Sequence, residues 1–335
     1  MSIDQLAAIA QAMVAPGKGI IAIDESTATI KKRFDSVGID CTEENRRAYR
    51  EMLLTTPKLG EHISGAILYD ETLRQKTKSG VPFTKVMMDN GILPGIKVDM
   101  GAKPLAGFPG ELVTEGLDGL RERLKEYAQL GAKFAKWRAV ITIGEDAPSG
   151  TCIEANCHAL ARYAALCQEA GIVPMVEPEV LMDGEHDIDT CYEITEVTLR
   201  SLFGALYEHN VMLEGTILKA SMVVSGKDAP EQASVDEVAE MTLRCLKSSV
   251  PATLPGIVFL SGGQSDEDAT AHLDAMNRLG PKPWPLSFSY GRAMQSAALK
   301  LWSKDLAGNV GVAQETVVAR ARDNGLAALG QWKKA

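Results

Sequence analysis

The chain contains the segments Phe134-Ala-Lys-Trp-Arg-Ala-Val140 and Ile172-Val-Pro-Met-Val-Glu-Pro-Glu-Val180. Both are short and mostly apolar, and their charged residues fall at alternate positions. Between them, residues Thr151–Glu169 have the pattern of a helix. A buried strand, a helix and a second buried strand in succession are typical of a parallel βαβ unit, in which helices cover the sheet.

The same alternation extends along the whole chain of 335 residues. The eight predicted strands are Gly19–Asp24, Gly65–Asp70, Gly91–Asp99, Phe134–Val140, Ile172–Val180, Val211–Ala220, Gly256–Gly263 and Leu286–Gly291. The clearest predicted helices are Thr42–Thr55, Glu115–Leu130, Thr151–Glu169, Asp187–His209 and Ser234–Ser248. No linker or repeat divides the chain, so we expect an α/β protein whose residues 1–335 form a single-domain (β/α)8 TIM barrel. An open, doubly wound sheet is the alternative.

The composition limits the possible partners and location. A formal net charge of -9 and a pI near 5.2 disfavour binding to nucleic acid and to anionic membranes. The uncharged run from Gln5 to Gly17 is too short to span a bilayer, and we expect it to form a covering helix. Six cysteines and five histidines show no metal-ligand spacing. We therefore expect a cytoplasmic protein with reduced cysteines and with no metal or other cofactor.

Charged and polar residues follow or end almost every predicted strand. In a closed barrel, residues in these positions converge on one mouth, where active sites form. Lys136 and Arg138 share one face of their strand, and Glu177 and Glu179 share one face of the next. Taken singly, each charge is more often a solvated strand end or a helix cap. Together they predict paired cations beside paired carboxylates.

Lys219 lies in the apolar segment Val211–Val224. Burial and a neighbouring cation such as Lys136 both disfavour an ammonium ion, so we expect a lowered pKa and an amine able to attack a carbonyl. Glu177 and Glu179 would carry protons during formation of the Schiff base. The sequence thus favours a nucleophilic lysine assisted by carboxylates.

The ends of the last two predicted strands favour a phosphate site. Gly262 and Gly263 allow backbone N–H groups to approach an anion, and Arg292 offers a planar set of donors that match phosphate oxygens. A Gly-Gly pair alone is more often a plain turn. Its position before a predicted helix strengthens the prediction.

These segments resemble the class I fructose-bisphosphate aldolases over most of the chain, from about Gly17 to the last helix. The motifs that carry the resemblance are GKGIIAIDEST, TEENRRAYREML, FAKWRAV, GIVPMVEPE, LEGTILK, FLSGGQS and FSYGRA. The resemblance implies reversible cleavage of fructose 1,6-bisphosphate, a phosphorylated sugar, to dihydroxyacetone phosphate and glyceraldehyde 3-phosphate. It also implies a homotetramer without a metal.

The resemblance further implies residue roles. Lys219 would be the Schiff-base nucleophile and Glu177 the general acid and base, with Glu179 and Lys136 assisting and Asp24 handling the sugar hydroxyl at the cleaved bond. Arg138 is a further candidate for substrate binding. The implied C1-phosphate residues are Ser261, Gly262, Gly263, Ser289, Gly291 and Arg292, and those around the C6-phosphate are Ser26, Arg33 and Lys97.

The chain departs from the family pattern at Ala28-Thr29, where Gly-Ser is common, and at Ala220-Ser221, where Pro-Asn or Pro-Ser is usual. The given sequence ends at Ala335 without the tyrosine-ended tail of muscle-type members. This predicts that exchange of the enamine proton either uses another group or is slower. Two alternatives remain open at this point. One is a barrel sugar-phosphate isomerase that uses carboxylate proton transfer, and the other is a binding or scaffold protein without catalysis.

Overall fold

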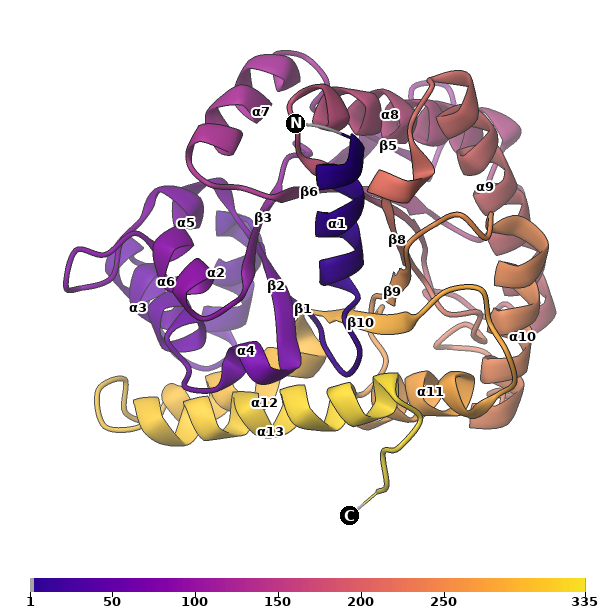
Figure 1. The fold of residues 1–335 in the computed structure, drawn as a ribbon. Helices are drawn as coiled ribbons and strands as arrows, with labels where there is room; N and C mark the ends of the chain where they lie inside the picture. Colours follow the sequence, from indigo (N-terminus) through magenta and orange to yellow (C-terminus); the bar gives the residue numbers. More distant parts are fainter. Residues whose placement is uncertain (1–2, 335) are drawn as a thin grey trace.

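The computed structural model describes residues 3–334, and its central feature is a closed barrel of eight parallel strands. Around the barrel the strands follow the order β1-β10-β9-β8-β7-β6-β3-β2, so each strand lies beside its neighbours in the sequence. Figure 1 shows the helices arranged around this ring. The predicted (β/α)8 fold is confirmed, and the open sheet is excluded.

All eight predicted strands are present, most of them shorter than predicted. Their bounds are β1 Gly19–Ile23, β2 Ile63–Leu68, β3 Leu93–Lys97, β6 Phe134–Ile141, β7 Val173–Val180, β8 Ile217–Ala220, β9 Ile257–Phe259 and β10 Leu286–Tyr290. The prediction of one strand over Val211–Ala220 was wrong in its first half, which contains the 3-10 turn η1 (Leu213–Gly215). A small antiparallel pair, β4 (Ala102–Pro104) and β5 (Leu112–Thr114), lies outside the barrel sheet.

Several of the helices begin at capping residues that are visible in the sequence. Ser234, for example, accepts a hydrogen bond from the backbone N–H of Glu237 at 3.3 Å. The helices are α1 Ile3–Met13, α2 Thr27–Asp35, α3 Glu43–Leu54, α4 Leu59–His62, α5 Asp70–Arg74, α6 Phe83–Asp89, α7 Leu120–Gln129, α8 Gly150–Glu169, α9 Ile188–Glu208, α10 Val235–Ser249, α11 Asp266–Arg278, α12 Arg292–Trp302 and α13 Val310–Ala328. The prediction of a helix from Glu115 was wrong, because Gly116 and Gly119 adopt positive φ and the helix starts only at Leu120.

The amino-terminal end of the barrel is filled by apolar side chains and covered by α1, which crosses the centre of the ring in Figure 1. Leu6 and Met13 of α1 pack in the same cluster as Phe134 and Met175. The Phe134 ring occupies the space where a Cβ on Gly95 would lie, only 2.2 Å away. The predicted covering helix is therefore confirmed, and within residues 3–334 it closes the amino-terminal end of the barrel.

Candidate active site

A cavity of about 1130 Å³ opens at the carboxyl ends of the strands. The predicted site residues that line it are Asp24, Ser26, Arg33, Lys97, Lys136, Arg138, Glu177, Glu179, Lys219, Ser261, Gly262, Ser289, Gly291 and Arg292. Gly263 is absent from the lining, but a Cβ built on it would lie 3.5 Å from Nη2 of Arg292. The structure thus brings together side chains that are spread over most of the sequence.

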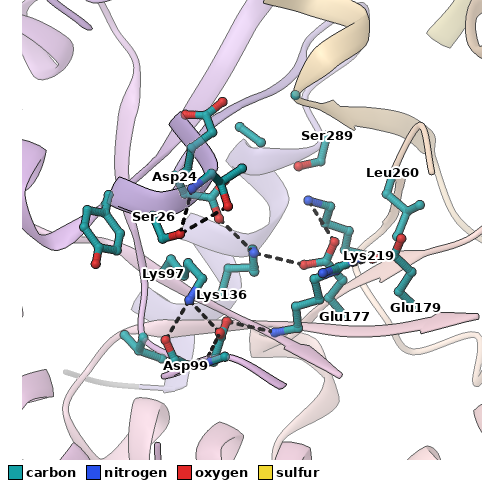
Figure 2. Close-up of a pocket in the computed structure, with 18 of the residues that line it drawn as sticks. Asp24, Ser26, Lys97, Asp99, Lys136, Glu177, Glu179, Lys219, Leu260 and Ser289 are labelled. Carbon is teal, nitrogen blue, oxygen red and sulfur yellow. Dashed lines mark hydrogen bonds and ion pairs between the residues drawn. The ribbon is translucent and has the colours of Figure 1, made fainter. Parts of the chain in front are cut away.

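A row of alternating charges crosses the floor of this cavity, as Figure 2 shows. Asp24 Oδ2 lies 2.8 Å from Lys136 Nζ. Lys136 Nζ lies 3.2 Å from Glu177 Oε2, and Glu177 Oε1 lies 3.1 Å from Lys219 Nζ. The side chains of Lys136, Glu177 and Lys219 are at most 5% exposed. Two positive and two negative charges therefore compensate each other in a site that is largely shielded from solvent.

Four strands supply this row, namely β1, β6, β7 and β8. In the backbone register Arg138 lies opposite Glu177, yet Glu177 pairs with Lys136, two residues earlier on β6. Side chains on one face of a strand repeat every two residues, so a diagonal neighbour is within reach of a long side chain. The sequence predicted the shared face, but not which cation each carboxylate contacts.

Electrostatic interactions shift the pKa values of two members of the row, Asp24 and Lys136. Burial by itself raises the pKa of Asp24, but Lys136 and Lys219 outweigh burial and lower the pKa to about 2. Burial alone would likewise lower the pKa of Lys136, whereas the carboxylates of Asp24 and Glu177 raise it above its usual value. The sequence-based expectation of a lowered pKa for Lys219 considered burial and the neighbouring Lys136. It did not consider the carboxylate of Glu177, whose Oε1 lies 3.1 Å from Lys219 Nζ and favours the charged amine.

Glu177 Oε2 is buried and has no hydrogen-bond partner, although Lys136 is close enough for an ionic interaction. A buried carboxylate oxygen that lacks a donor is costly, unless a ligand supplies the missing hydrogen bond. Glu177 lines the cavity. The free oxygen is thus available to a hydroxyl group of a bound molecule.

Glu179 contacts a different cation. Its Oε2 accepts a hydrogen bond from Nε of Arg138, whose side chain is 42% exposed. The two neighbouring carboxylates of β7 are therefore served by separate cations, Glu177 by two lysines and Glu179 by an arginine. This separation gives the two glutamates different environments on one strand face.

The predicted C1-phosphate residues lie where β9 and β10 end. Gly262 and Gly263 have φ angles of +57° and +100°, a conformation that glycine adopts readily and other residues rarely do. Arg292 is the first residue of α12, with Gly291 as its N-cap. The Ser289 hydroxyl is buried and has no partner. These groups offer unoccupied donors at one end of the cavity.

The predicted C6-phosphate residues are less closely grouped. Ser26 caps α2, and its hydroxyl lies 3.1 Å from that of Thr29. Lys97 Nζ donates to the carboxylate of Asp99 at 2.5 Å and to its backbone oxygen at 2.7 Å. Arg33 is paired with Glu25, and its Nη2 lies 3.9 Å from the place of a Cβ on Gly291. Arg33 therefore lies next to a member of the predicted C1-phosphate group.

Sequence reasoning missed several buried partners of these residues. Asp99 is the counter-ion of Lys97, and Glu25 that of Arg33. Arg50 is 1% exposed and donates to the backbone oxygen of Glu25 at 3.1 Å. Asp99 and Glu25 lie just after the ends of β3 and β1, and this position could have indicated that they belong to the site. Nothing in the sequence of the helical segment around Arg50 indicates that this arginine is buried.

The low pKa of Asp24 predicts the pH dependence of one variant. Because this pKa is lowered to about 2, the carboxylate is ionised throughout pH 5–9. Asp24→Asn should therefore reduce kcat by the same factor across pH 5–9, and we expect about 10²-fold, the usual scale for a positioned acid or base. The measurement is a kcat profile of both proteins. A loss that shrinks below pH 6 would show that Asp24 titrates there.

Two further observations concern ligands and membranes. No helix among residues 3–334 is long and apolar enough to cross a membrane. Within the same residues, no group of three or more His, Cys, Asp or Glu side chains is arranged to hold a metal ion. The cavity is lined mainly by lysine, arginine, carboxylate, serine and glycine residues.

Comparison with known proteins gives the family. A family model described as "Fructose-bisphosphate aldolase class-I" matches residues 5–335. A probable fructose-bisphosphate aldolase class 1 from Xanthomonas campestris pv. campestris is 78% identical over 333 residues, which is 99% of this chain and 100% of the relative. The cytosolic fructose-bisphosphate aldolase 4 of Arabidopsis thaliana is 53% identical over 95% of this chain and 81% of its own length.

The structural comparison agrees. Fructose-bisphosphate aldolase from Plasmodium falciparum, solved in a ternary complex with TRAP and a small-molecule inhibitor, has a TM-score of 0.98 and 47% identity. The match covers 99% of this chain and 96% of that one. These findings favour a lyase over the isomerase and scaffold alternatives. The chain belongs to the class I fructose-bisphosphate aldolases, enzymes that break and form a carbon–carbon bond through a Schiff base.

Proposed function

We propose that Lys219 is the residue that forms the Schiff base with the C2 carbonyl of fructose 1,6-bisphosphate. The observation that carries this assignment is the position of its Nζ, buried at the cavity floor and 3.1 Å from Glu177 Oε1. Glu177 can accept the proton that the lysine must lose before it attacks a carbonyl. Lys136 has a carboxylate on each side and is the less suitable nucleophile.

Glu177 would then serve twice. Attack of the amine gives a carbinolamine, and loss of its hydroxyl as water needs an acid at the same place where a base was needed before. The carboxyl, with one oxygen near Lys219 and the other without a hydrogen-bond partner, is placed for both transfers. The product is an iminium, which accepts the electrons released when the C3–C4 bond breaks.

Asp24 would take the proton of the C4 hydroxyl as that bond breaks. Its low pKa keeps it ionised, and Lys136 beside it stabilises the anion before the reaction. The electron pair of the C3–C4 bond becomes the enamine of the dihydroxyacetone phosphate half, and glyceraldehyde 3-phosphate leaves. Protonation of the enamine at C3 and hydrolysis of the iminium return the free lysine.

The assignment of Lys219 can be tested by trapping. Incubation with dihydroxyacetone phosphate and borohydride should reduce the iminium to a stable secondary amine, and peptide mass spectrometry should locate it on Lys219. The reaction should proceed in excess chelator, since the iminium is the electron sink. An adduct on Lys136, or none on any lysine, would refute the proposal.

The residues that bind the C1-phosphate and those that bind the C6-phosphate should be distinguishable by comparing two substrates. Fructose 1-phosphate has the C1-phosphate but lacks the one at C6. If Lys97 binds the C6-phosphate, Lys97→Ala should lower kcat/KM for fructose 1,6-bisphosphate by about ten- to a hundredfold, the effect of about 1.5–3 kcal/mol for a charged donor. The same variant should leave fructose 1-phosphate nearly unchanged.

Arg292→Ala is the matched control, because this arginine belongs to the end that both substrates share. Arg292→Ala should lower kcat/KM for both substrates by similar factors. The measurement is the ratio of variant to wild-type kcat/KM for each of the two variants with each of the two substrates, at fixed ionic strength. Equal losses for both substrates in Lys97→Ala would place this lysine at the common end or in the chemistry. The same comparison with Arg33→Ala would decide its role, since it lies beside Gly291.

We further propose a cytoplasmic homotetramer without a bound cofactor. The support is family membership and the Arabidopsis thaliana relative that is named as cytosolic. Light scattering coupled to size exclusion would give the mass of the assembly, to be compared with 36.0 kDa for one chain.

A further inference from the structure

The side chain of Gln264 connects the Gly262-Gly263 turn to two other parts of the fold. Its Oε1 lies 2.7 Å from Nδ1 of His272 on α11. Its Nε2 donates to Sδ of Met222 at 3.6 Å, just after the strand that carries Lys219. Its backbone N–H donates to the oxygen of Ser261 at 2.9 Å and closes the turn.

The Gly262-Gly263 turn needs such contacts because its own residues have no side chains that could hold it in one conformation. Two successive glycines with positive φ can adopt other backbone conformations, so holding them in one conformation has an entropic cost. The turn nevertheless lies against Arg292, with Nη2 3.5 Å from the place of a Cβ on Gly263. An anion held by the turn and by Arg292 needs both in fixed positions.

His272 is suited to hold the amide. It is 8% exposed, and burial lowers its pKa although Asp268 opposes the shift, so the ring is neutral at physiological pH. Since Oε1 of Gln264 can only accept, Nδ1 of the ring carries the hydrogen. The helix itself is anchored, because Thr270 donates to Oδ1 of Asn324 at 2.8 Å.

We propose that Gln264 and His272 are positioning residues that hold the Ser261-Gly262-Gly263 turn in the conformation that binds the C1-phosphate. His272 contacts Gln264, whose backbone closes the turn, and neither residue lines the cavity. They therefore act on substrate binding through the phosphate alone. The inference rests on the proposed function, which places the C1-phosphate at this turn. It assigns a role to Gln264, which lies in the motif FLSGGQS, and adds His272, which no motif in the sequence marked.

The test compares dihydroxyacetone phosphate with dihydroxyacetone, which has the same carbonyl and no phosphate. His272→Leu and Gln264→Met remove the hydrogen bond from either side while keeping similar volume. Each should raise the apparent Kd for dihydroxyacetone phosphate about threefold to tenfold, the scale of one neutral hydrogen bond. The rate of borohydride-trapped adduct formation with dihydroxyacetone should stay within about twofold of the wild type.

Two controls separate positioning from general damage. His272→Asn keeps an amide donor near the place of Nδ1 and should restore the affinity for dihydroxyacetone phosphate. Thr270→Val removes a buried hydrogen bond of the same helix, and should lower the melting temperature without changing that affinity.

The outcomes are distinct. Equal losses with both ketones, or unchanged phosphate affinity in both His272→Leu and Gln264→Met, would overturn the inference. Absence of an adduct on Lys219 in the wild type would instead refute the proposed function. In that case calorimetric titration with dihydroxyacetone phosphate still reports whether the pair supports phosphate binding.

Discussion

Lys219→Met is expected to abolish cleavage of fructose 1,6-bisphosphate and to leave no borohydride adduct on the protein. Methionine has a similar length and no amine, so the C2 carbonyl has no nucleophile to form an iminium. Loss of the covalent route typically costs about 10⁴-fold or more in kcat. The measurement is the cleavage rate together with mass spectrometry of the trapped protein.

Lys136→Met is the matched control, since it removes one buried ammonium from the same row of charges. Lys219→Met leaves Lys136 between Asp24 and Glu177, whereas Lys136→Met leaves Lys219 beside Glu177 and removes the ion-pair partner of Asp24. We expect each variant to lose free energy of unfolding on the order of 3 kcal/mol. Lys136→Met should be slow but still trap an adduct on Lys219. An adduct that persists in Lys219→Met and disappears in Lys136→Met would exchange the roles of the two lysines.

The alternation of buried strands and helices predicted a parallel α/β fold, and the polar residues at almost every strand end favoured a closed barrel over an open sheet. The strand over Phe134–Val140 was predicted to within one residue, since apolar residues bound it at both ends and its two charged residues fall at alternate positions. The helix predicted from Glu115 was wrong because two glycines with positive φ delay its start to Leu120. Their φ angles depend on the tertiary structure, which the sequence pattern does not record.

The candidate site likewise has features that the sequence could predict and features that it could not. Residues at strand ends were predictable, because a parallel barrel brings all those ends to one mouth. The pairing inside the site was not, since Glu177 bonds diagonally across β6 and β7 instead of to its register partner Arg138. His272 was equally hidden: a histidine in the middle of a helix gives no sign that it contacts Gln264, eight residues earlier.

Glu177→Gln should slow both Schiff-base formation and steady-state turnover by about 10²-fold or more, the usual contribution of a positioned acid and base. The amide keeps the shape of the side chain but can neither take the proton of Lys219 nor give one to the carbinolamine hydroxyl. It also removes the anion that Lys136 and Lys219 share. Single-turnover trapping with dihydroxyacetone phosphate and kcat for the bisphosphate measure the two steps.

Glu179→Gln is the control for this variant, because it removes a carboxylate from the same face of the same strand. Glu179 is paired with Arg138, whose side chain is partly exposed to solvent. When the Glu179 carboxylate is removed, water can solvate the unpaired guanidinium of Arg138. We expect less than about a tenfold loss, well below the effect at Glu177. If Glu179→Gln slows trapping more than Glu177→Gln does, proton transfer belongs to Glu179, and the contact between Glu177 and Lys219 only holds the lysine in place.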